Sequence, residues 1–206
     1  YSSGIHDSFV TEAGNQGLEV VADEQFTADS KTDFSTQLQK MQSAGAELVF
    51  LPFYYTEAAL VLTQANTMGY KPTFFGCDGM DGILDVENFD TSLAEGLMLL
   101  TPFAADATDE KTVSFVTAYK DKFGDTPIQF AADAYDAAYI MKAAIEAGNL
   151  TPDMSVADLG TAMEEQMKSV KYDGLTGSGM TWDENGDVDK EPKAVIVKDG
   201  AYTSAD

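Results

Sequence analysis

The segment from Glu47 to Gly82 constrains the fold of this chain more than any other part of the sequence. It starts with ELVFLPF, a largely apolar run that is short enough to form a buried strand. A helical pattern begins at Thr56 and ends at Gly69, because glycine favours the left-handed backbone of a helix terminus, and Pro72 prevents the helix from resuming. The next apolar run, Thr73–Gly76, predicts a second strand parallel to the first, since a helical crossover joins parallel neighbours. The segment is therefore typical of a β-α-β unit in an α/β protein.

Aromatic and acidic side chains follow the two predicted strands at the points where they end. Tyr54 and Tyr55 come directly after the first strand, and Cys77 and Asp78 follow the second. In open parallel sheets, ligands bind just beyond the carboxyl ends of the strands. A carboxylate beside aromatic rings suits a small cationic group such as an ammonium. The sequence therefore predicts a small-molecule site at this edge of the sheet, with Tyr54 and Asp78 as candidate contacts.

Periodicity and breaker residues predict further elements along the chain. We expect strands at Leu18–Val21, Gly96–Thr101 and Ala194–Val197. We expect helices up to about Gly14, up to Gly45, over Asp109–Lys122, over Phe130–Ala147, and from a Ser155 cap to about Met167. The Gly-rich region 174–187 is predicted to consist of turns.

Four segments of the chain, taken in order, read TDFSTQLQKMQSAGAELVF, LVFLPFYYTEAALVLTQANTMGYKPTFFGCDG, FVTAYKDKFGDTPIQFAADAYDAAYIMKAAIEAG and YDGLTGSGMTWDENGDV. Together they resemble the type I periplasmic-type binding proteins of the leucine/isoleucine/valine-binding group. The resemblance covers nearly the whole chain. It implies an α/β chain with the type I periplasmic-binding-protein fold, in which a doubly wound parallel-sheet lobe is joined to helices of a second lobe.

The resemblance also implies how the chain is divided. Residues 1–103 are expected to form lobe two without its first strand, 104–190 the C-terminal helical part of lobe one, and 191–206 a strand that returns to lobe two. Members of the group carry a complete first lobe before the point at which this chain begins. We therefore expect a C-terminal fragment whose fold is completed by the missing lobe-one segment or by another chain. Alone, such a fragment is expected to be oligomeric or only partly folded, with weak ligand affinity, because open strand edges and apolar helix faces recruit partners.

Three residues match ligand-binding positions of the family. Tyr54 matches the first tyrosine of a strand-end pair that packs on the bound amino acid, and Tyr1 matches a tyrosine that lines the site from lobe two. Asp78 matches the acidic residue that accepts hydrogen bonds from the α-ammonium of the ligand, a position at which most leucine-binding members carry Glu. The shorter Asp therefore indicates a different or slightly displaced ligand. Without the resemblance, the tyrosines would be interpreted as core packing and Asp78-Gly79 as a turn.

The net charge of the chain limits the classes of partner that it can bind. The formal net charge is −23, and every basic residue is lysine. Such a field repels phosphate backbones and anionic lipids, so nucleic-acid binding is not expected. Without arginine, the chain lacks the side chain that holds a carboxylate in two parallel hydrogen bonds. If the ligand is an amino acid, this chain is expected to bind its ammonium end, and the absent lobe its carboxylate.

The sequence predicts no catalytic residue, no cofactor and no metal site. Cys77 lacks a base, because the only histidine, His6, lies on a predicted exposed helix face. The glycines between positions 174 and 179 lack the strand-to-helix context of a nucleotide-binding loop. Asp183–Asp187 has its glycine at the wrong position for a calcium loop. Carboxylate pairs such as Asp78 with Asp81 leave open a hydrolase that works through two acidic residues.

The resemblance implies the extracytoplasmic solute-binding component of an ABC importer, which closes on an amino acid by a hinge motion and docks on a membrane permease. It places the protein in a periplasm, or on a cell surface through a lipid on an N-terminal region. No apolar run of the sequence approaches the length of a membrane helix. Two alternatives stay open: a ligand-sensing domain of a receptor with the same fold, and the carboxylate-based hydrolase.

Overall fold

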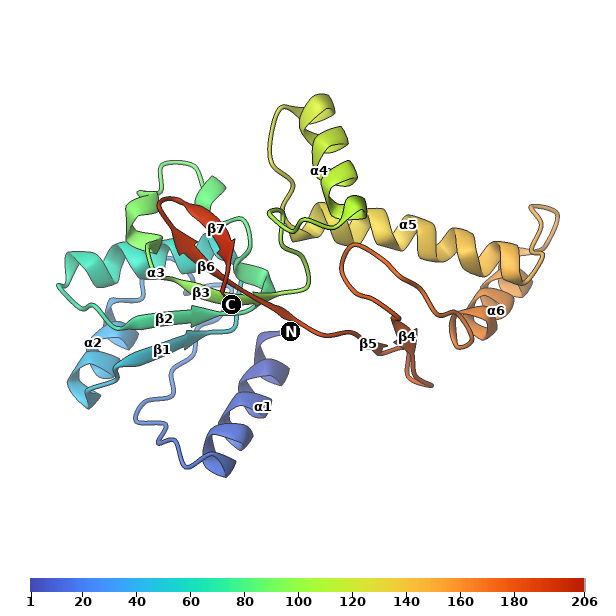
Figure 1. Cartoon of the computed structure of the whole chain (residues 1–206). Helices are drawn as coiled ribbons and strands as arrows, with labels where there is room; N and C mark the ends of the chain where they lie inside the picture. The colour runs from blue at the N-terminus through green and yellow to red at the C-terminus, as the bar shows by residue number, and fades with distance from the viewer. Residues whose placement is uncertain (206) are drawn as a thin grey trace. The chain divides into compact units, whose positions relative to one another are not determined.

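The computed structural model describes residues 1–205, which form two compact units (Figure 1). The first unit comprises Tyr1–Thr101 together with the residues from Ala194 onward, and the second comprises Pro102–Lys193. The chain therefore leaves the first unit once and returns to it near its end. The assignment of 1–103, 104–190 and 191–206 to lobes stays a prediction.

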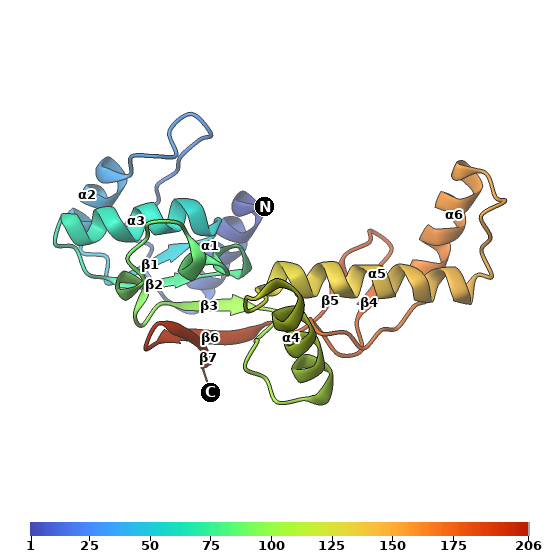
Figure 2. The same cartoon turned by 90° about the horizontal axis from the view of Figure 1, so that it is seen from above.

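The first unit is a five-stranded sheet with helices. Its helices are α1 (Ser2–Asn15), α2 (Ser35–Ala44) and α3 (Tyr55–Thr67), and three short 3₁₀ turns follow at Asp78–Met80, Ile83–Asp85 and Thr91–Ala94. Its strands are β1 (Leu48–Leu51), β2 (Thr73–Gly76), β3 (Met98–Thr101), β6 (Lys193–Lys198) and β7 (Ala201–Ser204). The strand order is β1-β2-β3-β6-β7, as Figure 2 shows. β1, β2 and β3 run parallel, whereas β6 and β7 form an antiparallel hairpin.

Helices cover both faces of this sheet because successive side chains of a strand point to opposite sides. Val49 and Leu51 of β1 are buried in a core with apolar residues of α2 and α3. Phe50, which lies between them, points the other way and stacks on Phe9 of α1, with ring centroids 4.4 Å apart. α1 and α3 therefore lie on opposite faces (Figure 1). This arrangement confirms the predicted doubly wound α/β fold.

The predicted β-α-β unit is present with nearly the expected bounds. β1 and β2 are in register from Leu48 opposite Thr73 to Leu51 opposite Gly76. α3 starts after Tyr54, and Gly69 adopts the left-handed conformation with φ 70° just beyond its end. The carboxyl ends of β1 and β2 consequently meet at one edge of the sheet, called the carboxyl edge below.

The strand predicted at Leu18–Val21 is wrong. The segment between α1 and α2 has no regular secondary structure, and the side chains of Leu18, Val20 and Val21 are exposed. β1 is the edge of the sheet, and within residues 1–205 no strand pairs with this segment. An apolar run needs a hydrogen-bonded neighbour to become a strand, and periodicity alone does not reveal whether one is present.

The second unit is helical with one short hairpin. It contains α4 (Glu110–Phe123), α5 (Gln129–Ala147) and α6 (Val156–Met167), followed by β4 (Thr181–Trp182) and β5 (Val188–Asp189). Side chains of Asp109 and Ser155 accept hydrogen bonds from the first turns of α4 and α6, so the predicted Ser155 cap is confirmed. The β4–β5 hairpin was not predicted. Asp183–Asp187, the segment compared with a calcium loop, forms its turn, in which the Asp183 carboxylate accepts backbone hydrogen bonds from Asn185 and Asp187.

A buried carboxylate holds the Gly-rich loop of the second unit in place. Asp136 of α5 is 2% exposed and accepts hydrogen bonds from the backbone N–H groups of Leu175 (2.9 Å) and Thr176 (2.8 Å). The Thr176 hydroxyl donates a third, at 2.8 Å. Gly174 lies so close to Asp136 that a Cβ there would overlap the carboxylate. The glycine at 174 therefore allows a close approach of the backbone to a buried side chain.

Candidate functional site

The strand ends place Tyr54 and Asp78 on the carboxyl edge of the sheet. Tyr54 follows β1 as the residue that precedes α3, and Asp78 follows β2 as the first residue of a 3₁₀ turn. Because β1 and β2 are adjacent and parallel, these two positions face the same edge. Tyr54 is 48% exposed, and Asp78 is half-buried.

Tyr1 reaches the same edge from α1. Its ring stacks on that of Tyr54, with centroids 4.9 Å apart and planes inclined by 22°. Its hydroxyl donates a hydrogen bond of 2.6 Å to Oδ1 of Asp78. The structure therefore brings together all three residues that the resemblance singles out. Tyr1 and Tyr54 contact each other through their rings, and Tyr1 contacts the carboxylate of Asp78 through its hydroxyl.

The hydroxyl of Tyr1 has two further neighbours. It accepts a hydrogen bond of 2.9 Å from the backbone N–H of Gly79, and the Sγ atom of Cys77 lies 3.2 Å away. Burial, followed by the hydrogen bond to Asp78, raises the pKa of the Tyr1 phenol well above its ordinary value. The hydroxyl therefore stays protonated, and its hydrogen is available for the hydrogen bond to Asp78.

Cys77 and Gly79 are parts of this arrangement that sequence reasoning did not assign to it. Cys77 is 8% exposed, and burial raises the pKa of its thiol, so the thiolate that a nucleophile needs is disfavoured. His6 lies elsewhere on α1, where its ring bonds Asp7 and Asp23. The adjacency of Cys77 and Gly79 to Asp78 was the only signal in the sequence, and it does not reveal a contact with Tyr1.

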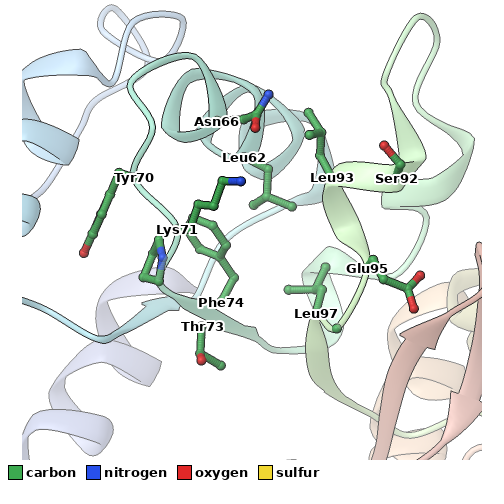
Figure 3. A pocket seen from close by; sticks show the side chains of 12 residues that line it. Leu62, Asn66, Tyr70, Lys71, Thr73, Phe74, Ser92, Leu93, Glu95 and Leu97 are labelled. Atoms are coloured by element: carbon green, nitrogen blue, oxygen red, sulfur yellow. The ribbon is translucent and has the colours of Figure 1, made fainter.

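A separate hollow of about 390 Å³ lies at the opposite end of β2 (Figure 3). Thr73 and Phe74 at the start of that strand line it together with Leu62 of α3 and Leu97. Lys71 and Glu95 are exposed at its margin. Tyr1, Tyr54 and Asp78 are not among its lining residues, so it is distinct from the candidate site.

Among residues 1–205, no three His, Cys, Asp or Glu side chains are grouped so that they could hold a metal ion. None of the described helices combines the length and the apolar character that crossing a membrane requires.

Comparison with known proteins agrees with the fold. The family described as periplasmic binding protein matches residues 1–201. The leucine-, isoleucine-, valine-, threonine-, and alanine-binding protein of Pseudomonas aeruginosa is 27% identical over 189 residues, which are 91% of this chain and 48% of that protein. Leu/Ile/Val-binding protein homolog 7 of Brucella abortus is 32% identical over 126 residues, 59% of this chain and 31% of that protein.

A solved structure extends the agreement to three dimensions. The crystal structure of a leucine binding protein from Thermotoga maritima matches with a TM-score of 0.83 at 28% identity, covering 100% of this chain and 56% of that one. The chain thus spans about half the length of this protein and of the Pseudomonas relative. Since the family match extends over almost every residue and the fold agrees with it, this chain belongs to the periplasmic binding protein family.

Proposed function

We propose that this chain supplies one side of the ligand site in an extracytoplasmic solute receptor of an ABC importer, and that the ligand is an amino acid. The observation that carries the proposal is the grouping of Tyr1, Tyr54 and Asp78 at the carboxyl edge of the sheet. The relatives from Pseudomonas and Thermotoga, named for the amino acids that they bind, support it.

In this proposal, Asp78 accepts hydrogen bonds from the α-ammonium of the ligand. A carboxylate that pairs with a cation away from bulk water makes the stronger, charge-assisted kind of hydrogen bond. The stacked rings of Tyr1 and Tyr54 offer π-faces beside that carboxylate, and such faces attract a cation further. Tyr54 and Asp78 come from different strand ends, so correct packing of β1 against β2 is a condition for binding.

The α-carboxylate of the ligand requires other partners. The chain has no arginine, and its formal charge of −23 disfavours an isolated anion near its surface. We infer that hydroxyl and backbone N–H groups of a second lobe bind the carboxylate, and that the ligand closes the two lobes upon each other by linking them. Closure then shifts the population toward a form that docks on a membrane permease.

The proposal contains no chemical step. The receptor binds and releases the amino acid unchanged outside the cytoplasmic membrane, in a periplasm or at a cell surface. The disfavoured thiolate of Cys77 and the pairing of His6 with Asp7 and Asp23 support a site without a nucleophile.

A thermal-shift panel of the common amino acids and simple sugars tests the proposal on the protein at its full natural length. A ligand that binds only the folded state raises the midpoint by mass action. We expect a rise with one or a few amino acids and none with sugars. A flat response to every amino acid, at concentrations up to about 10 mM where even millimolar affinities are visible, contradicts the proposal.

A further inference from the structure

The hydroxyl of Tyr1 is held by three consecutive residues of the loop after β2. It donates to Oδ1 of Asp78 at 2.6 Å, accepts from the N–H of Gly79 at 2.9 Å, and lies 3.2 Å from Sγ of Cys77. A phenol hydroxyl has one hydrogen to donate and two lone pairs with which to accept. With its hydrogen on Asp78, it accepts from Gly79 and from the thiol of Cys77. These three contacts use its whole hydrogen-bonding capacity.

Gly79 is the residue that allows this approach. A Cβ at position 79 would lie 2.7 Å from the Tyr1 hydroxyl oxygen and 3.1 Å from the carbonyl oxygen of Phe53. The first distance is shorter than any ordinary contact of a methyl group. Gly79 is not among the glycines with positive φ, so its backbone conformation is open to alanine. The closeness of Tyr1 is therefore the main reason for glycine at this position, and the Phe53 carbonyl is a second, milder one.

We propose that Gly79 is a positioning residue of the ligand site. Its missing side chain lets the Tyr1 hydroxyl dock on the loop, and that hydroxyl then orients the carboxylate of Asp78. The inference rests on the proposed function and deepens it. Tyr1 faces the ligand with its ring only, because its hydroxyl is fully used within the protein, and the ammonium selectivity of the site depends on Tyr1 through Asp78.

Two probes separate orientation of the carboxylate from general damage to the site. Leucine carries the ammonium, and 4-methylpentanoic acid has the same carboxylate and side chain without it. In the protein at its full natural length, Tyr1→Phe removes the hydroxyl and keeps the ring. We expect about tenfold weaker binding of leucine, the equivalent of one charge-assisted hydrogen bond. The affinity for 4-methylpentanoic acid should change by less than about twofold, because that probe does not use Asp78.

A double-mutant cycle tests Gly79 itself. Gly79→Ala should weaken leucine binding about tenfold or more in the native background, because its methyl group displaces Tyr1. In a Tyr1→Ala background, the methyl group meets only the Phe53 carbonyl oxygen, at 3.1 Å, and Gly79→Ala should weaken binding by no more than about threefold. If alanine at position 79 only destabilised the protein in general, it would weaken leucine binding equally in both backgrounds. A smaller effect in the Tyr1→Ala background therefore shows that the methyl group acts through Tyr1.

Matched controls are available in the same unit. The Tyr202 hydroxyl also accepts a backbone N–H from a glycine, that of Gly82 at 3.1 Å, but it lies outside the site. Gly4 has open space around its Cα, so Gly4→Ala tests the effect of alanine without a clash. Tyr202→Phe and Gly4→Ala should leave the affinity for leucine unchanged.

The outcomes separate this inference from the function on which it rests. If the unaltered protein binds leucine and Asp78→Asn weakens that binding, but Tyr1→Phe and Gly79→Ala bind as well as the unaltered protein, the positioning role is overturned and the proposed function stands. The positioning role is also overturned if Gly79→Ala is equally harmful with and without the Tyr1 ring. If no amino acid binds the unaltered protein, the proposed function fails, and the inference fails with it.

Discussion

The ring of Tyr1 stacks on the ring of Tyr54, although the two residues flank different helices of the first unit. Each residue directly precedes a helix, Tyr1 before α1 and Tyr54 before α3. α1 and α3 cover opposite faces of the sheet, so their amino ends meet only at its carboxyl edge. The stacked pair lies beside Asp78 and is about half exposed, which leaves ring surface available to a ligand.

The stacked pair predicts that amino-acid binding weakens when one of its rings is removed. Tyr54→Ala should weaken amino-acid binding by about 1 kcal/mol, or roughly fivefold, because it removes an aromatic face and the stacking partner of Tyr1. Tyr54→Phe keeps the ring and should bind almost as well as the unaltered protein. Isothermal titration calorimetry of both variants decides the matter, and equal affinity of the alanine variant would remove Tyr54 from the site.

Removing the negative charge of Asp78 should weaken ligand binding more than removing the ring of Tyr54. In the closed form that we propose, the pair of Asp78 and the ligand ammonium is buried, and truncating one partner of such a pair costs about 2 to 5 kcal/mol, so Asp78→Asn should weaken amino-acid binding at least about thirtyfold. Asp29→Asn removes the same charge from an exposed loop residue and serves as the control for net charge. If calorimetry shows that Asp78→Asn and Asp29→Asn weaken binding equally, only the overall charge of the chain matters.

His6 is predicted to titrate above its ordinary range. Hydrogen bonds to Asp7 and then to Asp23 raise its pKa above 6.5. A raised pKa means that the contribution of these bonds to stability is fully present below pH 6.5 and is lost as the pH rises through the folded-state value. Because the chain has one histidine, its imidazole proton signal in an NMR titration is unambiguous.

The matched change for His6 is at Asp23, which lies in the segment between α1 and α2. Asp23→Asn should move the pKa of His6 back toward 6.5, since one of its two carboxylate partners is removed. An unshifted titration curve in that variant would show that the contact between His6 and Asp23 does not persist in solution.

Asp136 is predicted to be essential to the stability of the second unit. Asp136→Ala leaves the N–H groups of Leu175 and Thr176 buried without their acceptor, and should lower the free energy of unfolding by about 3 kcal/mol. Asp133, on the same helix, is 37% exposed at its side chain and pairs with Lys190 at 3.4 Å. Asp133→Ala should cost less than about 1 kcal/mol. Urea denaturation compares the two, and similar midpoints would contradict the prediction.

The protein should turn over none of its ligands. Incubation with amino acids, peptides and glycosides should leave each compound intact by mass spectrometry, because a raised thiol pKa at Cys77 and a histidine held elsewhere provide no activated nucleophile. Turnover that disappears in Asp78→Asn or in another carboxylate variant would instead favour the hydrolase alternative.

The sequence by itself determined the β-α-β unit and the edge at which the site lies. Alternation of apolar runs with helical spacing, ended at Gly69, is local information, and the structure places β2 at the predicted residues, Thr73–Gly76. Once two strands are parallel neighbours, the residues after them must share an edge, so Tyr54 and Asp78 could be paired from the chain alone.

Only the tertiary structure decided what these residues touch. The hydroxyl of Tyr1 reaches Asp78 and Gly79 through the packing of α1 on the sheet, and no spacing in the sequence encodes that distance. Long-range pairing likewise adds the β6–β7 hairpin to the sheet and leaves the apolar Leu18–Val21 without a partner strand among residues 1–205. Local periodicity tells which residues can form a strand, but hydrogen bonds and close contacts between distant segments exist only after the chain has packed.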